Sequence, residues 1–327
     1  MVALDLAEWR LVVVDLEARR ITAISRRGEG PGEYKEVSGL FAIGVDTTIV
    51  EDRQSARWLV MRGGELRGMV RVPGRGQRGP TIVGLARDRV VETVTHTAGR
   101  ETGIPVMPMR ENAESIAVVL YPRFTLGREV GLVGADTLRT LRGRFGGQRR
   151  IQRGEVNGGP HYYLLDSPLG VEEQAVVFPD GWIAYVLASP YRVEWRTAKG
   201  ASVVGAPLPF VPRPVTEEMK RAAIRRLWPK RSLDVIRPSE YPGWPATLPP
   251  FPNEAALAAP DGQVIIERFS LPGDRVRRYD IVDRSGALTA RLVLDERQRL
   301  LGFGKRTAYV AYKDDDDLEW LQRFDWP

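Results

Sequence analysis

The sequence predicts an all-β protein: a six-bladed β-propeller, one domain over residues 1–327, with a short helical and proline-rich insertion. Three observations support this prediction. The chain holds 33 glycines and 24 prolines, spread along its whole length, as expected for short strands joined by turns. β-Branched runs of strand length recur between these turns. A unit of four strands repeats roughly every 40 to 55 residues, a period typical of propeller blades.

The N-terminal part reads as short strands with tight turns. Residues 9–15 (WRLVVVD) and 20–25 (RITAIS) form the first pair. Four further strands are expected at residues 40–45, 47–51, 57–62 and 66–72. The Gly63-Gly64 pair predicts a hairpin turn between the last two of these strands, because glycine accepts the positive φ that such turns need.

The C-terminal part contains two similar units and a shorter last one. Residues 175–210 and 255–294 share a small apolar strand, a Pro-Asp-Gly turn and a β-branched strand. A last unit covers residues 300–326. Four consecutive acids, Asp314 to Asp317, fall where a turn between its final strands is expected. They lack the alternation and glycine of an EF-hand, so we interpret them as a solvated turn.

Residues 213–252 break the strand pattern and predict an insertion between two blades. Thr216 can cap a helix that continues with Glu217 and Glu218 and ends near Trp228, before Pro229. Met219, Ala223 and Leu227 are spaced to lie on one face, which we expect to pack on the propeller. The alternative is a helix that docks a partner. The proline-rich residues 238–252 would cover a propeller face or present a binding edge.

The charge balance is basic, with 48 Lys and Arg against 42 Asp and Glu. Both signs are abundant, so most of this charge is interpreted as a solvated surface. The strongest local concentration is residues 139–153, which hold arginines and no acid. The candidate contact residues there are Arg139, Arg142, Arg144, Arg149, Arg150 and Arg153. They would bind phosphates, lipid headgroups or an acidic protein surface, and the alternative is a plain exposed loop or strand edge.

Tryptophans add two further candidates. Trp182, Trp195, Trp320 and Trp326 lie in or beside strands and are expected to pack between blades. Trp228 and Trp244 lie in the insertion and are interpreted as interface anchors. We expect no nucleic-acid partner, because Phe145 is the one aromatic residue interleaved with the arginines of residues 139–153.

The sequence offers no complete motif for catalysis or for a cofactor. The chain has no cysteine, which excludes disulfides and thiolate sites. His96 and His161 have no metal-ligand spacing around them. Residues 74–79 match the pattern GxGxxG, but a proline and a strand follow instead of the helix that dinucleotide binding requires. We therefore predict no catalytic residue, no metal and no cofactor.

Residues 28–34 read GEGPGEY and follow a strand pair. This passage resembles the bacterial six-bladed β-propeller family, relatives of the NHL-repeat propellers. Further matches are the Pro-Asp-Gly turns, the passage from residue 207 to residue 218, and residues 299–304. From the residues themselves, Gly28, Gly30, Pro31 and Gly32 predict a stiff loop between blades. Glu33 is placed to bond exposed backbone N–H groups of this loop.

The resemblance implies a propeller and a binding protein, of a family often exported or lipid-anchored, and hence an extracytoplasmic (periplasmic) location. The sequence as written favours the cytoplasm instead. Its first 15 residues carry Asp5 and Glu8 and no basic stretch before an apolar one, so they do not read as a signal peptide. No apolar run reaches 18 residues, so we predict no transmembrane segment.

The leading functional hypothesis is a non-catalytic binding or scaffold protein. It would be an extrinsic subunit that mediates protein–protein contacts in a larger, membrane-embedded complex, such as a photosynthetic or electron-transfer complex. The insertion and the arginine-rich segment would make these contacts. The first alternative is a hydrolase or lyase with a metal in the central channel, since inward-facing residues from separate blades escape linear motifs. The second alternative is a carbohydrate or peptide sensor.

Overall fold

A computed structural model describes most of the chain. It covers residues 2–5, 8–30, 32–43, 46–73, 81–86, 89–97, 113–143, 148–156, 159–227, 237–241, 243–270 and 273–327. The chain groups into two compact units. The first comprises Met1–Val94, Ala117–Arg139 and Val177–Gly181, and the second comprises Thr95–Ile116, Thr140–Val176 and Trp182–Pro327. Each unit is described by itself, and the single domain over residues 1–327 stays a prediction.

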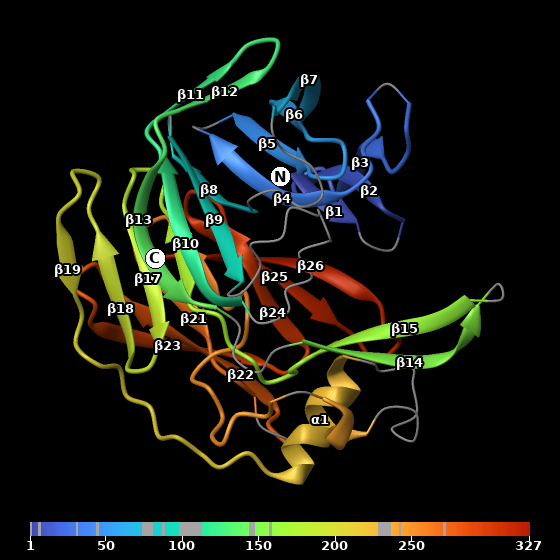
Figure 1. Ribbon diagram of the computed structural model, residues 1–327. Coiled ribbons are helices and arrows are strands. Elements are labelled where there is room, and N and C mark those ends of the chain that lie inside the picture. The colour runs from blue at the N-terminus through green and yellow to red at the C-terminus, as the bar shows by residue number, and fades with distance from the viewer. Residues whose placement is uncertain are drawn as a thin grey trace. The chain divides into compact units, whose positions relative to one another are not determined.

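The first unit is built from antiparallel sheets whose strands follow one another in the chain (Figure 1). One sheet has the order β1-β2-β3 and the next has the order β4-β5-β6-β7. Most of a third sheet, β13-β10-β9-β8, belongs here, together with the β11-β12 ribbon. The bounds are β1 Val2–Asp5, β2 Arg10–Asp15, β3 Arg20–Arg26, β4 Val37–Ile43, β5 Thr47–Asp52, β6 Arg57–Arg62, β7 Glu65–Arg71, β8 Thr81–Ala86, β9 Arg89–Thr97, β10 Ala113–Tyr121, β11 Arg123–Leu126, β12 Val130–Val133 and β13 Asp136–Arg142.

The second unit repeats the same plan. Its sheets have the orders β16-β17-β18-β19, β20-β21-β22-β23 and β24-β25-β26, and β14 pairs with β15 in a separate ribbon. The bounds are β14 Gln148–Val156, β15 Gly159–Asp166, β16 Gln174–Val177, β17 Ile183–Ala188, β18 Tyr191–Arg196, β19 Ser202–Val204, α1 Glu217–Leu227, the 3₁₀ helix η1 Pro238–Glu240, β20 Ala256–Ala258, β21 Val264–Glu267, β22 Val276–Val282, β23 Leu288–Asp295, β24 Gln298–Phe303, β25 Thr307–Lys313 and β26 Glu319–Asp325.

These sheets confirm the predicted fold class. Six of them have three or four antiparallel strands in the described part of the chain, which is the composition of a six-bladed β-propeller. The α-helix of the described residues is α1, and it lies in the predicted insertion. No helix within the described ranges is long and apolar enough to cross a membrane.

Most strand predictions hold because local turn chemistry marks their ends. Gly63 and Gly64 have φ values of 59° and 84°, as the hairpin between β6 and β7 requires. Gly181 and Gly262 both have φ 88°, so the two Pro-Asp-Gly passages are turns of the same kind. The strand expected at residues 40–45 begins earlier, at Val37, because Val37 still pairs with Asp52 of β5.

Helix α1 begins where its cap predicts. The Thr216 hydroxyl oxygen accepts a hydrogen bond from the Met219 N–H at 3.2 Å. The most buried side chain of the described helix is Ile224, with Met219 and Ala223 partly buried beside it. The buried face therefore lies close to the predicted one but is centred on a residue that the spacing argument did not name. The Leu227 side chain lies outside the described residues.

Each unit has its own apolar core. In the second unit, Ile265, Tyr279, Leu300 and Val310 join the sheets of β20–β23 and β24–β26 into one cluster. In the first unit, fully buried Trp58 packs edge-on against Phe124 with ring centroids 5.9 Å apart. Burying such side chains is the main favourable term in folding, so each of these clusters stabilises the unit that contains it.

Candidate functional site

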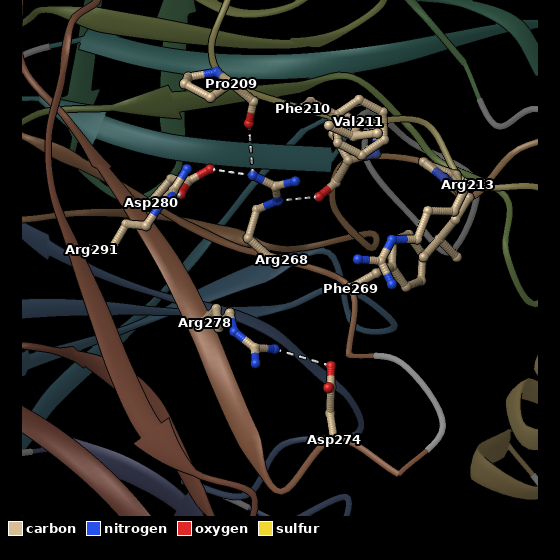
Figure 2. A pocket seen from close by; sticks show the side chains of 13 residues that line it. Pro209, Phe210, Val211, Arg213, Arg268, Phe269, Asp274, Arg278, Asp280 and Arg291 are labelled. Carbon is tan, nitrogen blue, oxygen red and sulfur yellow. Dashed lines mark hydrogen bonds and ion pairs between the residues drawn. The ribbon is translucent and has the colours of Figure 1, made fainter.

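A pocket of about 520 Å³ lies in the second unit (Figure 2). Its volume is in the range of small-ligand and peptide sites. Three parts of the chain form it: the segment after β19, the end of the insertion, and the strands β22 and β23 with the residues that follow β21. It is lined by Pro209, Phe210, Val211, Arg213, Leu248, Pro249, Pro250, Arg268, Phe269, Asp274, Arg278, Asp280 and Arg291.

One wall of the pocket is residues 206–215, which we call the strap. Prolines fix φ and lack an N–H, so the proline-rich strap runs extended without joining a ladder. It is held at both ends by backbone bonds. The Leu208 N–H donates to the Tyr191 C=O at 2.7 Å, and the Leu248 N–H donates to the Arg213 C=O at 2.7 Å. The predicted insertion thus starts and ends side by side, at the pocket.

The strap leaves β19 through a close glycine contact. A Cβ atom added to Gly205 would lie 2.6 Å from the Val193 carbonyl oxygen and 2.7 Å from the Gly286 Cα. Real Cβ atoms do not approach other atoms so closely, so the position accepts glycine alone without a shift of the backbone. The turn between β22 and β23 and the start of the strap are therefore placed against each other.

The floor of the pocket is a buried ion cluster around Asp280. This carboxylate is 1% exposed and accepts hydrogen bonds from three side chains. The Arg268 Nη1, the Arg291 Nε and the Tyr191 hydroxyl donate to it at 2.6, 3.1 and 3.0 Å. A buried carboxylate is tolerated only when it is paired and hydrogen-bonded in this way. Asp280 is therefore a structural anchor of the site.

Arg268 links this floor to the walls, as the dashed bonds in Figure 2 show. Its Nε donates to the Pro250 C=O at 2.9 Å and its Nη1 lies 3.4 Å from the Pro209 C=O. The guanidinium also sits over the rings of Tyr191 and Phe210, with centroid distances of 5.1 and 5.3 Å. One side chain thus holds the strap, the end of the insertion and β22 together.

Burial raises the pKa of the Tyr191 hydroxyl well above its ordinary value, and the negative charge of Asp280 raises it further. Tyr191 therefore stays protonated at physiological pH and donates to Asp280. Its ring is also wedged between Phe210 and Phe251, at centroid distances of 6.2 and 5.8 Å. Tyr191 therefore holds the cluster together through its hydroxyl and its ring.

The mouth of the pocket carries the remaining charge. Arg291 and Arg278 are about half exposed, with side-chain exposures of 51% and 48%. Arg278 pairs with Asp274 at 3.0 Å, and Arg213 reaches toward the same space from the opposite wall (Figure 2). Four arginines face two aspartates in the lining, so positive charge is in excess. The described lining contains no histidine, serine, cysteine or lysine.

This arrangement suits binding. Guanidinium groups at the mouth match carboxylate or phosphate oxygens, and the prolines, Phe210, Phe269 and Leu248 offer apolar surface beside them. Among the described residues no group of three or more acids or histidines is placed to hold a metal ion. The side chains of His96 and His161 lie outside the described residues.

The arginine-rich segment of the sequence is divided between two strands. Arg139 and Arg142 lie on β13, whose sheet is completed by β10, β9 and β8. Arg149, Arg150 and Arg153 lie on β14, which pairs with β15 in a two-stranded ribbon. Arg142 is exposed, and its N–H donates to the Glu173 carboxylate at 2.9 Å. Arg144 and the side chains on β14 lie outside the described residues, and the segment stays a predicted contact surface.

The two tryptophans of the insertion have different outcomes. Trp228 lies outside the described residues. The Trp244 Nε1 donates to the Pro238 C=O at 2.8 Å, its ring packs on Tyr241, and the Lys220 ammonium lies 5.8 Å from the ring centroid. Trp244 is therefore partly buried and joins α1 to η1, and its role as an interface anchor stays a prediction.

The GEGPGEY loop is a structural element of the first unit. The Glu33 carboxylate accepts the Gly30 N–H and the Arg26 Nε, both at 2.7 Å, the kind of bond that the sequence predicts. A Cβ atom on Gly28 would lie 2.0 Å from a Glu33 carboxylate oxygen. The Arg26 guanidinium and the Gly30 N–H hold the pKa of Glu33 below its ordinary value. Gly32 adopts φ 81°, and Pro31 lies outside the described residues.

Comparison with known proteins adds likenesses of fold alone. No model of a protein family matches the sequence, and no curated protein matches it significantly. Among solved structures, a streptogramin B lyase aligns with TM-score 0.35 and 9% identity over 98% of this chain and 77% of its own. BBS1N, solved in complex with ARL6DN, aligns with TM-score 0.35 and 10% identity over 100% of this chain and 91% of its own. Neither likeness bears on the site.

Sequence reasoning missed the residues that build the pocket. Arg213, Arg268, Arg278 and Arg291 are scattered over almost 80 positions, and each looks like an ordinary surface arginine. One signal was present: Asp280 interrupts the apolar end of β22, which reads VRRYDIV. An acid at such a position predicts a buried ion pair, because a strand face in the core does not accept an unpaired charge.

Proposed function

We propose that this chain is a non-catalytic binding protein that holds an acidic segment of a protein partner in the pocket beside β22 and β23. The observation that carries the proposal is the excess of arginine at a mouth whose floor is already neutralised. Asp280 is bonded to Arg268, Arg291 and Tyr191, so it does not compete for the charge of Arg213, and Asp274 pairs with Arg278. An incoming carboxylate would meet Arg213 at the mouth, beside the paired Arg278 and the half-exposed Arg291.

The walls favour a peptide with apolar side chains next to its acids. Phe210, Phe269 and Leu248 supply apolar contact in a pocket of about 520 Å³. Both ends of the insertion contribute to this lining. This supports the predicted docking role of residues 213–252, and an extrinsic subunit of a larger assembly would dock through this pocket.

A binding titration tests the proposal. The probe is a fluorescent peptide of glutamate, aspartate and phenylalanine, compared with the same peptide carrying glutamine and asparagine. We expect the acidic peptide alone to raise the anisotropy, with an affinity that falls as salt is added. Arg213→Gln should weaken binding about tenfold, which is about 1.4 kcal/mol. Its backbone carbonyl, which holds the strap, is unchanged.

The matched control is Arg299→Gln, an exposed arginine on β24 that does not line the pocket. It should leave the affinity unchanged. Equal binding of the acidic and amide peptides would overturn the proposal. Complete displacement of the peptide by inorganic phosphate, added at the same concentration as the peptide, would instead indicate a small anion as the ligand.

A further inference from the structure

A second interaction surface lies at the edge of the last sheet and does not depend on the pocket. Strand β26 is the outer strand of the sheet β24-β25-β26. In the two other main sheets of this unit, the third strand is covered by a fourth: β19 covers β18 and β23 covers β22. No described strand covers β26 in this way. Among the described strands of the second unit, the outer edge of β26 is therefore an open sheet edge.

The backbone direction on β26 is fixed by bonds at its two ends. The Leu318 C=O accepts the Asp314 N–H, and the Trp326 N–H donates to the Arg306 C=O, so both residues face the β25 side. The pairing of β26 with β25 runs without a register shift. Because successive residues of a strand alternate, Glu319, Leu321, Arg323 and Asp325 direct their N–H and C=O groups to the open edge.

Large apolar side chains are exposed along the same strand. Trp320 and Phe324 are 56% and 45% exposed, and Leu318, directly before the strand, is 56% exposed. Trp320 is held in place, since its Nε1 donates to the Asp314 carboxylate at 2.6 Å. This corrects the expectation that Trp320 packs between blades. An open edge with ordered, exposed aromatic side chains is a surface that proteins normally cover.

The sequence of β26 is complementary to itself. We propose that β26 pairs antiparallel with β26 of a second copy of this chain, about a two-fold axis at Leu321. In this register Glu319 lies opposite Arg323 of the second copy, twice, and Leu321 lies opposite Leu321. Leu318 then faces Phe324, and Trp320 faces Gln322. Each of the three exposed apolar side chains thereby gains a cross-strand neighbour on the same face of the sheet.

The neighbouring two-fold register centred on Gln322 is disfavoured by charge. It also pairs residues that direct their backbone to the open edge, but it places Glu319 opposite Asp325 twice. Like charges directly opposite each other in a sheet are destabilising. Among the residues of β26 itself, charge therefore favours the register centred on Leu321 over the one centred on Gln322. The interface is isologous, as closed dimers require.

A charge exchange on the full chain tests this dimer by sedimentation velocity over a concentration series. The wild-type chain should be a dimer at high concentration. Glu319→Arg and Arg323→Glu should each weaken the dimer at least tenfold, because each places like charges opposite each other. An equimolar mixture of the two variants should restore the dimer, since every cross-strand charge pair is then of opposite sign.

The control is Glu65→Arg on β7, another exposed edge strand, which should leave the dimer unchanged. Hydrogen exchange on the unmodified chain gives an independent reading. The amides of Glu319 and Leu321 should gain protection as the protein concentration rises. A monomer at every concentration, a dimer that both variants retain, or exchange at these amides that does not depend on concentration would each overturn the pairing.

Discussion

Gly205 and Gly286 touch back to back: a Cβ atom on Gly286 would lie 2.3 Å from the Cα of Gly205. Gly286 also adopts φ 82° in the turn between β22 and β23. The contact places the start of the strap against this turn, and the strap is one wall of the pocket.

We expect Gly286→Ala to destabilise the chain more than Gly273→Ala. Both glycines have φ 82°, so both substitutions incur the left-handed strain of about 1 to 2 kcal/mol. A Cβ on Gly273 meets nothing within 4 Å, whereas one on Gly286 must displace backbone. Urea unfolding of the two variants measures the difference. Equal losses of unfolding free energy in the two variants would show that the backbones at Gly205 and Gly286 can move apart without a cost in stability.

Removing the anchor of the pocket floor should be costly. Asp280→Asn leaves the largely buried Arg268 without its carboxylate and removes the partner of the half-exposed Arg291, and we expect a loss of about 3 to 5 kcal/mol in the free energy of unfolding. The matched change Asp274→Asn breaks a more exposed pair with Arg278 and should cost less than about 1 kcal/mol. Chemical denaturation of both variants checks this. Similar losses would contradict the anchoring role.

The contribution of the Tyr191 hydroxyl should depend on alkaline pH. The folded-state pKa lies above the ordinary value of 10.0, so the unfolded chain loses this proton first. The stability that the hydroxyl gives is therefore complete below about pH 10 and is lost as the pH rises toward the folded-state pKa. Near neutral pH, Tyr191→Phe should cost about 1 to 3 kcal/mol.

The measurement is the difference in unfolding free energy between the wild-type chain and Tyr191→Phe, near neutral pH and at about pH 11. We expect this difference to shrink at the higher pH. Tyr34 and Tyr279 also have raised pKa values, but they are present in both proteins and cancel. A difference that grows with pH would show that the Tyr191 hydroxyl is not held as described.

In the GEGPGEY loop, Gly28 and Glu33 should act as one unit. A methyl group at Gly28 occupies the place of the Glu33 carboxylate and pushes it from the Gly30 N–H and Arg26. Gly28→Ala should therefore lower the melting temperature of the wild-type chain. It should have little further effect in a Glu33→Ala background. Additive shifts would mean that Gly28 is required for another reason.

The sequence predicts the strands and turns of this chain well because their signals are local. Gly63-Gly64, the Pro-Asp-Gly turns and the Thr216 cap each depend on a few neighbouring residues. The turn at Asp314 also forms as expected, with its carboxylate accepting the Asp316 and Leu318 N–H groups. Such features are fixed by φ preferences and short-range hydrogen bonds, which a single sequence shows directly.

The candidate site is hidden from sequence for the opposite reason. Arg268 and Asp280 are brought together by the pairing of β21 with β22, and Arg213 joins them only because the insertion closes on itself. The run of arginines at residues 139–153 is divided between β13 and β14, and successive side chains of a strand alternate between its faces, so the run does not by itself define one surface. Charge that gathers in space need not gather in the chain.

The short bridge of Arg213 to Leu248, with the Val215 N–H donating to the Ala246 C=O at 3.1 Å beside it, has a consequence for the insertion. The residues between Val215 and Ala246 therefore leave and rejoin the pocket wall at one place. The two ends of the segment that holds α1 and η1 are fixed at the pocket wall by backbone bonds that involve neither helix. The pocket wall is thus joined to the insertion through two neighbouring pairs of backbone residues.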